Sequence, residues 1–277
     1  KRQILNGVDI PGLDPDRNTL QMDLFPTNML SNVLVIKSAR ADLPADFTGG
    51  VIDIITKDFP SKEEFSVSLN MGYNPDMHFN DNYLTYQGGS TDFLGFDDGS
   101  RKNKIANSLL GNAFDPRLNS AESTLNLVNR VSNQFDPQMA PKVSNSGMNF
   151  GLGITYGNQF NFENGNSIGV LGSLSYKNEQ TVYENTQDNL YNFSPDKSVL
   201  NFEENRIQYG TIGGHNIISS GLFGLTYKTK ASKYKFNGLH IQNGESTSGS
   251  FRQLTRFSDF IDFNKFNLEY NERSISN

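Results

Sequence analysis

The chain has 277 residues and a formal net charge of −6, with 21 Phe and 11 Tyr but no Cys and no Trp. No run of about 18 apolar residues occurs, which excludes a transmembrane helix and leaves β-barrel strands as the only way for this chain to cross a bilayer. The absence of Cys excludes disulfides, thiolate metal sites and Cys nucleophiles. The acidic balance and the scattered basic residues argue against nucleic acid as a partner.

Both ends of the sequence have the pattern of interior segments. Residues 1–5 carry neither a start methionine nor a secretion signal, and they continue directly into strand-like sequence. Residues 266–277 end in a similar pattern. We therefore expect further segments before and after this sequence.

Residues 1–60 have the pattern of a small α+β domain with a mixed sheet. Two dense apolar runs, residues 33–36 and 51–55, are separated by turns rich in Pro, Gly and Asp. Such runs are typical of strands that are buried on both faces. The composition changes near residues 58–64, and we place the domain boundary there, at residue 60.

From residue 61 to residue 277, apolar and polar residues alternate in short stretches. Six candidate strands lie near residues 65–73, 148–156, 168–176, 223–227, 234–236 and 266–270. A period of two predicts strands with one apolar and one polar face. Three leucines, Leu171, Leu222 and Leu239, fall on the polar face and interrupt the pattern.

The connections between these strands differ in length. A tight turn at residues 161–166 contains Asn164-Gly165, a strong hairpin signal, and residues 229–232 form a second short connection. The connections 74–147, 178–211 and 244–259 are long. Short turns at one end and long extracellular loops at the other are typical of outer-membrane barrels. Tyr residues near both strand ends fit the aromatic girdles of such barrels, although Tyr also favours strands in general.

Three runs of residues occur in a defined order: Ile4-Leu-Asn-Gly-Val-Asp-Ile10, Leu24-Phe-Pro-Thr-Asn-Met-Leu-Ser-Asn-Val-Leu-Val-Ile-Lys37 and Gly49-Gly-Val-Ile-Asp-Ile-Ile-Thr-Lys57. Together they resemble the C-terminal half of the plug domain of TonB-dependent outer-membrane receptors. The runs Asp42-Leu-Pro-Ala-Asp-Phe-Thr-Gly-Gly50, Lys57-Asp-Phe-Pro60 and Phe93-Leu-Gly-Phe-Asp-Asp-Gly99 are similar to the branch of this family that is common in Bacteroidota.

The resemblance implies a plug inside an antiparallel transmembrane β-barrel of 22 strands, of which this chain supplies a part. Residues 1–60 correspond to the C-terminal part of the plug, and residues 61–277 to about the first six barrel strands. It implies a transporter in the outer membrane of a Gram-negative bacterium. A TonB-type energising protein would act through a missing N-terminal segment, and import of a scarce ligand would follow displacement of the plug. A surface lipoprotein or another envelope protein is a further partner that the family admits.

Two groups of residues are candidates for ligand binding. Asp14, Asp16, Arg17 and Asn18 follow a Pro-Gly pair, and in the resembled fold this loop faces the incoming ligand. Paired carboxylates beside an Arg suit a polar or cationic group, but the same residues are also typical of a purely structural turn. Phe93 and Phe96 suit stacking on a ligand, or the core of the first long loop.

The nine residues expected to face lipid come from the first two candidate barrel strands. They are Phe65, Val67, Leu69, Met71, Tyr73, Phe150, Leu152, Ile154 and Tyr156. Lipid at these positions follows from the barrel interpretation, because the outward residues of a transmembrane strand contact the bilayer.

Other signals are weak. The three His residues lie too far apart in the sequence for a zinc pair, and Asp97-Asp98-Gly99 lacks the further ligands of a calcium loop. Residues 118–131 carry apolar residues at helical spacing and predict a short amphipathic helix. No nucleophile, acid–base set or phosphate loop can be assembled. We therefore expect no catalytic residues, no enzyme activity, no cofactor and no metal.

Two other functions remain open. The first is a structural barrel subunit of a larger outer-membrane complex, in which the long first loop serves as a docking surface. The second is a soluble, secreted β-rich adhesin. Stoichiometric partner proteins would favour the subunit, and extraction without detergent would favour the adhesin.

Overall fold

The structure is a computed structural model, and most of its described residues lie in β-strands. It describes residues 2–9, 30–38, 50–57, 60–102, 126, 129, 132–133, 138–194, 198, 200–256 and 260–276. Within these ranges no helix is long and apolar enough to span a membrane. The five positions expected to line the amphipathic face of a helix, from Leu118 to Val131, lie outside the described residues.

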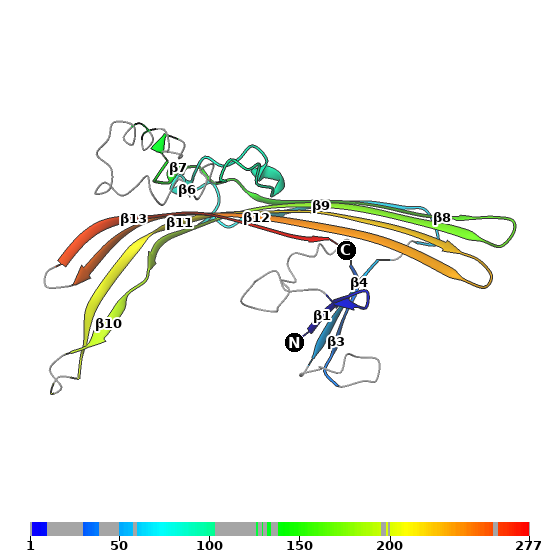
Figure 1. Ribbon diagram of the computed structural model, residues 1–277, viewed down its shortest axis with the longest axis horizontal. Coiled ribbons are helices and arrows are strands. Elements are labelled where there is room, and N and C mark those ends of the chain that lie inside the picture. Colours follow the sequence, from blue (N-terminus) through cyan, green and yellow to red (C-terminus); the bar gives the residue numbers. More distant parts are fainter. Residues whose placement is uncertain are drawn as a thin grey trace.

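Seven strands form one long, curved antiparallel sheet (Figure 1). In spatial order these are β13 (Phe260–Ser276), β12 (Lys233–Arg256), β11 (Phe202–Lys228), β9 (Ser167–Gln187), β8 (Asn149–Asn161) and β5 (Glu64–Gly72), with β10 (Leu190–Phe193) paired to β11. The six long strands match the six predicted ones in the predicted order, with Tyr73 and Met148 one residue beyond the ends of β5 and β8. Among the described strands the sheet stays open, with β5 and β13 at its two edges.

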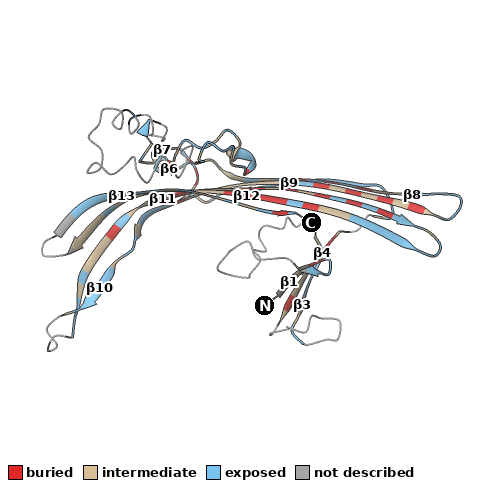
Figure 2. Cartoon of the chain, in the orientation of Figure 1, coloured by how far each residue is buried: buried red, intermediate tan, exposed pale blue. Residues whose placement is uncertain are grey.

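Burial along these strands alternates in the opposite sense to that of a water-soluble sheet. In β8 the inward residues Gly153, Thr155 and Gly157 are buried, while the apolar residues between them, Ile154 and Tyr156, are exposed. The same pattern of buried small or polar residues and exposed apolar ones occurs in β11 from residue 223 to residue 227 (Figure 2). The predicted division into an apolar and a polar face is therefore confirmed, and it is the apolar face that is exposed.

The two predicted short turns are present. Phe162 donates a backbone hydrogen bond to Asn166 across the first turn, and Gly165 occupies the left-handed region with φ of 82°. In the second turn the Thr229 N–H donates to the Ser232 carbonyl. Both turns lie at the same end of the sheet, which we call the hairpin end.

Two of the three expected long loops are mostly strand. The segments predicted as loops at 178–211 and 244–259 continue as β9, β10, β11 and β12, so that β11 alone runs for 27 residues. The sequence signal was missed because polar residues lie on both faces of these stretches and leave no alternation to detect.

Residues 2–56 contribute a separate four-stranded sheet in the order β2-β1-β4-β3. Its strands are β1 (Arg2–Leu5), β2 (Val8–Asp9), β3 (Leu30–Ile36) and β4 (Val51–Thr56). The β1 and β4 strands pair in parallel and the others antiparallel, so the predicted mixed sheet is present. The expectation that both apolar runs are buried was wrong for β3, an edge strand whose Val33, Leu34 and Val35 are exposed.

The small sheet lies on the concave side of the long sheet (Figure 1). Leu5 and Ile54 of the small sheet are fully buried in one cluster with side chains from the long sheet. The members contributed by the long sheet are Leu171, Ile218, Leu222, Leu239, Ile241 and Ile275. The three leucines that interrupted the sequence pattern therefore mark the place where the small sheet packs.

The first long connection folds over the opposite, convex side of the long sheet (Figure 1). It contains β6 (Tyr83–Thr85), the 3₁₀ helix η3 (Asp92–Leu94) and β7 (Lys142–Ser144), and β6 pairs with β7. Its two ends are tied together, because Ser146 donates its N–H to the Asn80 carbonyl and its hydroxyl to the Met77 carbonyl. Residues 80–102 therefore form an ordered cover, which we call the outer loop.

Candidate functional site

The convex face of the long sheet carries a continuous band of exposed apolar side chains at the hairpin end. Cross-strand pairs join Val67 to Ile154 and Leu69 to Leu152, and both β8 residues pair onward into β9. All nine residues that were expected to face lipid are exposed. The band continues across the sheet through Leu174, Phe223, Leu225, Tyr227, Tyr234 and Phe236, which are exposed as well. An exposed apolar area of this extent marks a surface that contacts something other than water.

The concave face of the long sheet combines one apolar patch with polar and small residues. Beside the cluster, in the same row of cross-strand partners as Leu222, the Thr155 and Ser173 hydroxyls lie 2.8 Å apart and both side chains are buried. Further from the hairpin end, the Asn243 amide donates to the Asn216 side-chain oxygen at 2.6 Å. A buried polar group is stable only when it is hydrogen-bonded, and these groups are. The inner face is therefore built for polar surroundings outside the patch that meets the small sheet.

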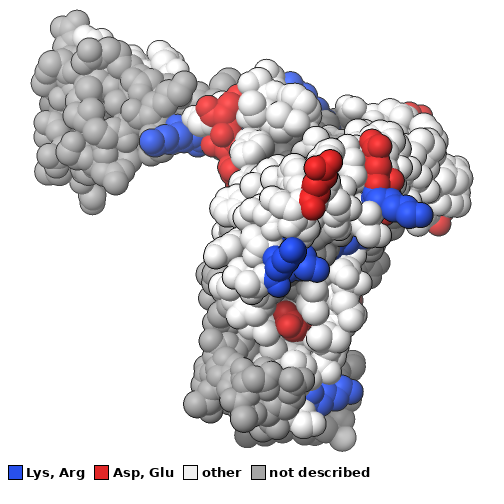
Figure 3. Space-filling model, turned by 90° about the vertical axis from the view of Figure 1, so that its right-hand side faces the viewer, with Lys and Arg blue, Asp and Glu red and all other residues white. Residues whose placement is uncertain are grey.

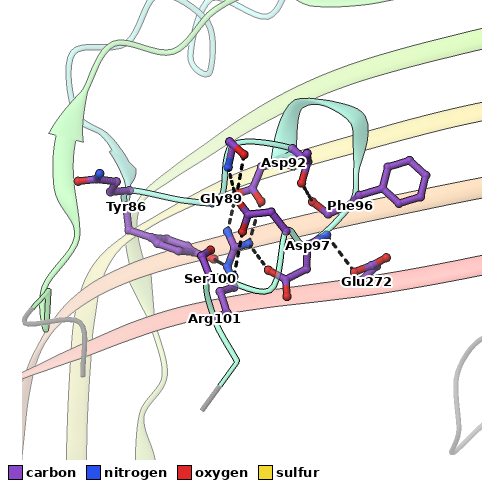
Figure 4. A network of polar contacts seen from close by, with 12 residues as sticks. Tyr86, Gly89, Asp92, Phe96, Asp97, Ser100, Arg101 and Glu272 are labelled. Atoms are coloured by element: carbon purple, nitrogen blue, oxygen red, sulfur yellow. Dashed lines mark hydrogen bonds and ion pairs between the residues drawn. The ribbon is translucent and has the colours of Figure 1, made fainter. Parts of the chain in front are cut away.

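Arg101 holds the outer loop on the convex face. Its guanidinium forms an ion pair with Asp92 and another with Asp97 at 3.0 Å, and it lies 3.9 Å from the centre of the Tyr270 ring. Figure 4 shows this network, in which the Asp97 N–H also donates to Glu272 of β13 at 3.0 Å. These contacts connect the loop to an edge strand that is far away in the sequence.

Further hydrogen bonds attach the loop next to η3. The Tyr176 hydroxyl donates to the Phe93 carbonyl at 2.7 Å and the Ser219 hydroxyl to the Leu94 carbonyl at 2.8 Å. The Gln242 amide donates to the Gly95 carbonyl at 2.7 Å. Gly95 has φ of 84°, and a Cβ there would stand 3.0 Å from the Gly244 nitrogen, so only glycine suits this close approach.

Burial and hydrogen bonding shift several pKa values under the outer loop. Burial raises the pKa of Tyr83 to about 12. Hydrogen bonds from Ser100 and Ser90 lower the pKa of Asp98, and the hydrogen bond to Asp92 is the main cause that raises the pKa of Arg101. Burial lowers the pKa of His215, partly offset by the charge of Asp92. Asp98 and the Arg101 guanidinium therefore stay charged, and His215 favours its neutral form.

Phe93 and Phe96 lie on the convex side, away from the small sheet. Phe96 stacks on His240 with 6.3 Å between ring centres, and Phe93 is largely exposed. In the same loop Tyr83 is buried, as a loop core requires. The structure does not bring these rings towards the space next to the small sheet. Ligand contact by Phe93 and Phe96 stays a prediction.

The other ligand candidates, Asp14, Asp16, Arg17 and Asn18, lie outside the described residues. Within the described ranges, no group of three His, Asp or Glu side chains could hold a metal ion. Seen from the hairpin end, charged side chains are few and scattered among uncharged ones on the described surface (Figure 3). The described residues on this side therefore show no concentrated charge of one sign.

Reasoning from the sequence did not find the role of Arg101, Tyr270 and Glu272. Only the fold brings β13 next to the outer loop, and one sequence carries no signal for that pairing. Comparisons with family models, with curated proteins and with solved structures found no match to this chain.

Proposed function

We propose that this chain is part of a TonB-dependent outer-membrane transporter of the type common in Bacteroidota. In this proposal the long sheet is a segment of the wall of a barrel of about 22 strands, and the small sheet is part of its plug. The observation that carries it is the polarity of the curved sheet: exposed apolar residues cover the convex face at the hairpin end, and a small sheet packs on the concave face.

The dimensions of the apolar band suit a bilayer. From Lys228 to Ser219, β11 has ten residues between the hairpin turn and the first contact with the outer loop. A tilted strand needs about 9–11 residues to cross the hydrocarbon core. Along β11 the band therefore ends where the outer loop begins. At its other border, next to the hairpin turns, Tyr227 and Tyr234 are direct cross-strand partners, as expected of an aromatic girdle in contact with headgroups.

The open edges of the sheet support a wall segment as well. β5 and β13 each leave one side of their backbone without a partner among the described strands. Unpaired edges inside a bilayer are costly, because no water is present to satisfy the backbone groups. About sixteen further strands would pair with these edges and close the barrel.

The mechanism follows from the contact between the two sheets. A TonB-type protein would pull on the segment before residue 1 and displace the small sheet from the concave wall. Ligand bound on the outer side would need different affinities for the resting and the displaced state, because equal affinities shift no equilibrium. The substrate class stays open between ferric siderophore, peptide, glycan and cobalamin.

Two neighbouring residues test the membrane part of the proposal. Val67 lies on the convex face and Ser68 on the concave face of the same edge strand, and both are exposed. Val67→Arg should cost about 2–4 kcal/mol of stability in a bilayer, whereas Ser68→Arg should be tolerated. The measurement is urea unfolding of the complete protein in lipid vesicles. Equal effects of the two substitutions would contradict a lipid-facing convex face.

Uptake tests the transport part. Deleting the energising protein should abolish uptake of the ligand while the barrel remains in the membrane. Unchanged uptake of every candidate ligand would contradict the proposal.

A structural subunit of an outer-membrane complex is the second candidate function, and the position of the outer loop favours it. The loop is fixed on the outside of the wall by Arg101 and Gln242, where it cannot gate the space next to the small sheet. A loop held on the outer wall is suited to docking another envelope protein. Co-purification of a stoichiometric partner that is lost in Arg101→Ala would support this function.

A further inference from the structure

The apolar band contains a hollow where glycines replace large side chains. One row of cross-strand partners reads Tyr156, Gly172, Phe223 and Gly238. The next row towards the outer loop reads Ile154, Leu174, Gly221 and His240. Large side chains thus surround three positions that have none.

These glycines form the floor of a groove in the convex face. One part of the groove has a volume of about 690 Å³ and lies between Tyr156, Phe223 and Phe236. A second part of about 380 Å³ reaches Phe96 of the outer loop. Both parts share Ile154, Leu174, Gly221 and His240 in their linings. The two hollows therefore form one path from the band to the edge of the loop.

At the end of this path that lies next to the outer loop, polar groups already form hydrogen bonds within the protein. The Tyr176 and Ser219 hydroxyls donate to loop carbonyls, and the His240 Nδ1 atom lies 2.8 Å from the Ser276 Oγ atom. Phe96 covers the His240 ring. The groove therefore offers apolar contact along its length and little to distinguish one headgroup from another.

We propose that this groove, floored by Gly172, Gly221 and Gly238, binds an acyl chain of a bilayer lipid. The proposal rests on the proposed function, because it requires that the convex face contacts the membrane. Continuity of the groove with the exposed apolar band indicates lipid as the occupant. A methylene chain buried in such a groove gains free energy with each CH₂ that leaves water or a looser contact.

The glycines also permit a sharp test. A Cβ at Gly172 or Gly238 would meet no atom within 4 Å, and neither residue has a positive φ. Leucine at these positions should therefore occupy the groove without moving the wall. Val67→Leu is the matched control, since it adds apolar volume to the same face outside the groove.

The experiment is native mass spectrometry of the complete protein in mild detergent, titrated with a phosphatidylethanolamine that has two C16 chains. We expect the wild type to retain lipid, the double variant Gly172→Leu/Gly238→Leu to retain at least tenfold less, and Val67→Leu to match the wild type. Gly172→Ala, the smallest addition, should fall in between and guards against misfolding of the double variant. Equal retention by all four proteins would overturn the proposal.

A vesicle flotation assay separates the two proposals. If the wild type floats with vesicles and the groove variants retain as much lipid as it does, the acyl-chain site is wrong and the membrane location stands. If the wild type does not float with vesicles, both are wrong.

Discussion

The guanidinium of Arg101 lies against the face of the Tyr270 ring, 3.9 Å from its centre. This contact joins the outer loop to the edge strand β13, while Asp92, Asp97 and Tyr86 of the loop itself hold the guanidinium from other sides. A stacked, ion-paired Arg is not equivalent to Lys, because only the planar guanidinium satisfies both contacts. Arg101 therefore adds an ion-paired, stacked contact to the hydrogen bonds that Tyr176, Ser219 and Gln242 make with the outer loop.

Arg101→Ala should release the outer loop. The lost stacking and ion pairs should cost about 1–3 kcal/mol of local stability. Limited proteolysis between residues 86 and 102 should become several times faster, while the hairpin at residues 161–166 stays protected. Arg252→Ala is the control, since Arg252 pairs with Asp262 at an exposed position and should change little. Equal proteolysis rates in wild type and Arg101→Ala would contradict this role.

Leu222 and Leu225 lie on opposite faces of β11 and form a matched pair for the contact between the two sheets. Leu222→Ala removes a buried side chain from the cluster with Leu5 and Ile54, and should cost about 2–4 kcal/mol. Hydrogen exchange should then increase in β1 and β4. Leu225 is exposed on the convex face, so Leu225→Ala should leave exchange in the small sheet unchanged. Faster exchange in both variants would contradict a specific contact.

Gly165 should be difficult to replace because of its backbone conformation. Its φ of 82° lies in the left-handed region, and a Cβ there would approach the Lys230 side chain at 3.0 Å. Gly165→Ala should therefore cost about 1 kcal/mol. Gly172→Ala is the control, because its Cβ meets open space. Urea unfolding of both variants measures the difference, and a cost at Gly172 equal to that at Gly165 would contradict the argument from φ.

His215 should make the packing of the outer loop depend on pH. Burial lowers its pKa in the folded protein, and its Nε2 atom has no hydrogen-bond partner within the described part of the chain. A depressed folded pKa means that the unfolded state binds more protons, so stability is lost as pH falls below the ordinary value of about 6.5. Loop proteolysis should be faster at pH 5.5 than at pH 7.5.

His215→Gln should remove most of this pH dependence, since glutamine does not titrate. Asp92, whose charge acts on His215 in the opposite sense, remains in this variant. A pH dependence that is unchanged in His215→Gln would assign the effect to other groups.

The strands of the hairpin end were predictable because each has a strict period of two. Phe65, Val67, Leu69 and Met71 all lie on one face, as their spacing indicates. The extensions of β9, β11 and β12 were not predictable, since both of their faces carry polar residues and only strand pairing defines them. Where both faces are polar, the one-residue alternation carries no information.

In the sequence, the contact between the long sheet and the small sheet could be seen only as exceptions to the alternation of apolar and polar residues. Leu171, Leu222 and Leu239 break the alternation because they meet the small sheet, and Leu5 and Ile54 supply the other half of the contact. A single sequence does not show which exceptions belong together. The same limit applies to Arg101, whose partners on β13 are brought close only by the complete sheet.

If the long sheet lies in an outer membrane as proposed, the length of β11 determines how far the sheet extends beyond the bilayer. With 27 residues at about 3.4 Å each and a tilt near 40°, such a strand would rise roughly 70 Å, against an apolar belt of about 25 Å. In an outer membrane, most of the length of this strand would therefore lie outside the bilayer, in the external medium. Under the proposed function, antibodies, phages and neighbouring polysaccharide would then contact β-structure here, and the opening of the barrel would lie well above the headgroups.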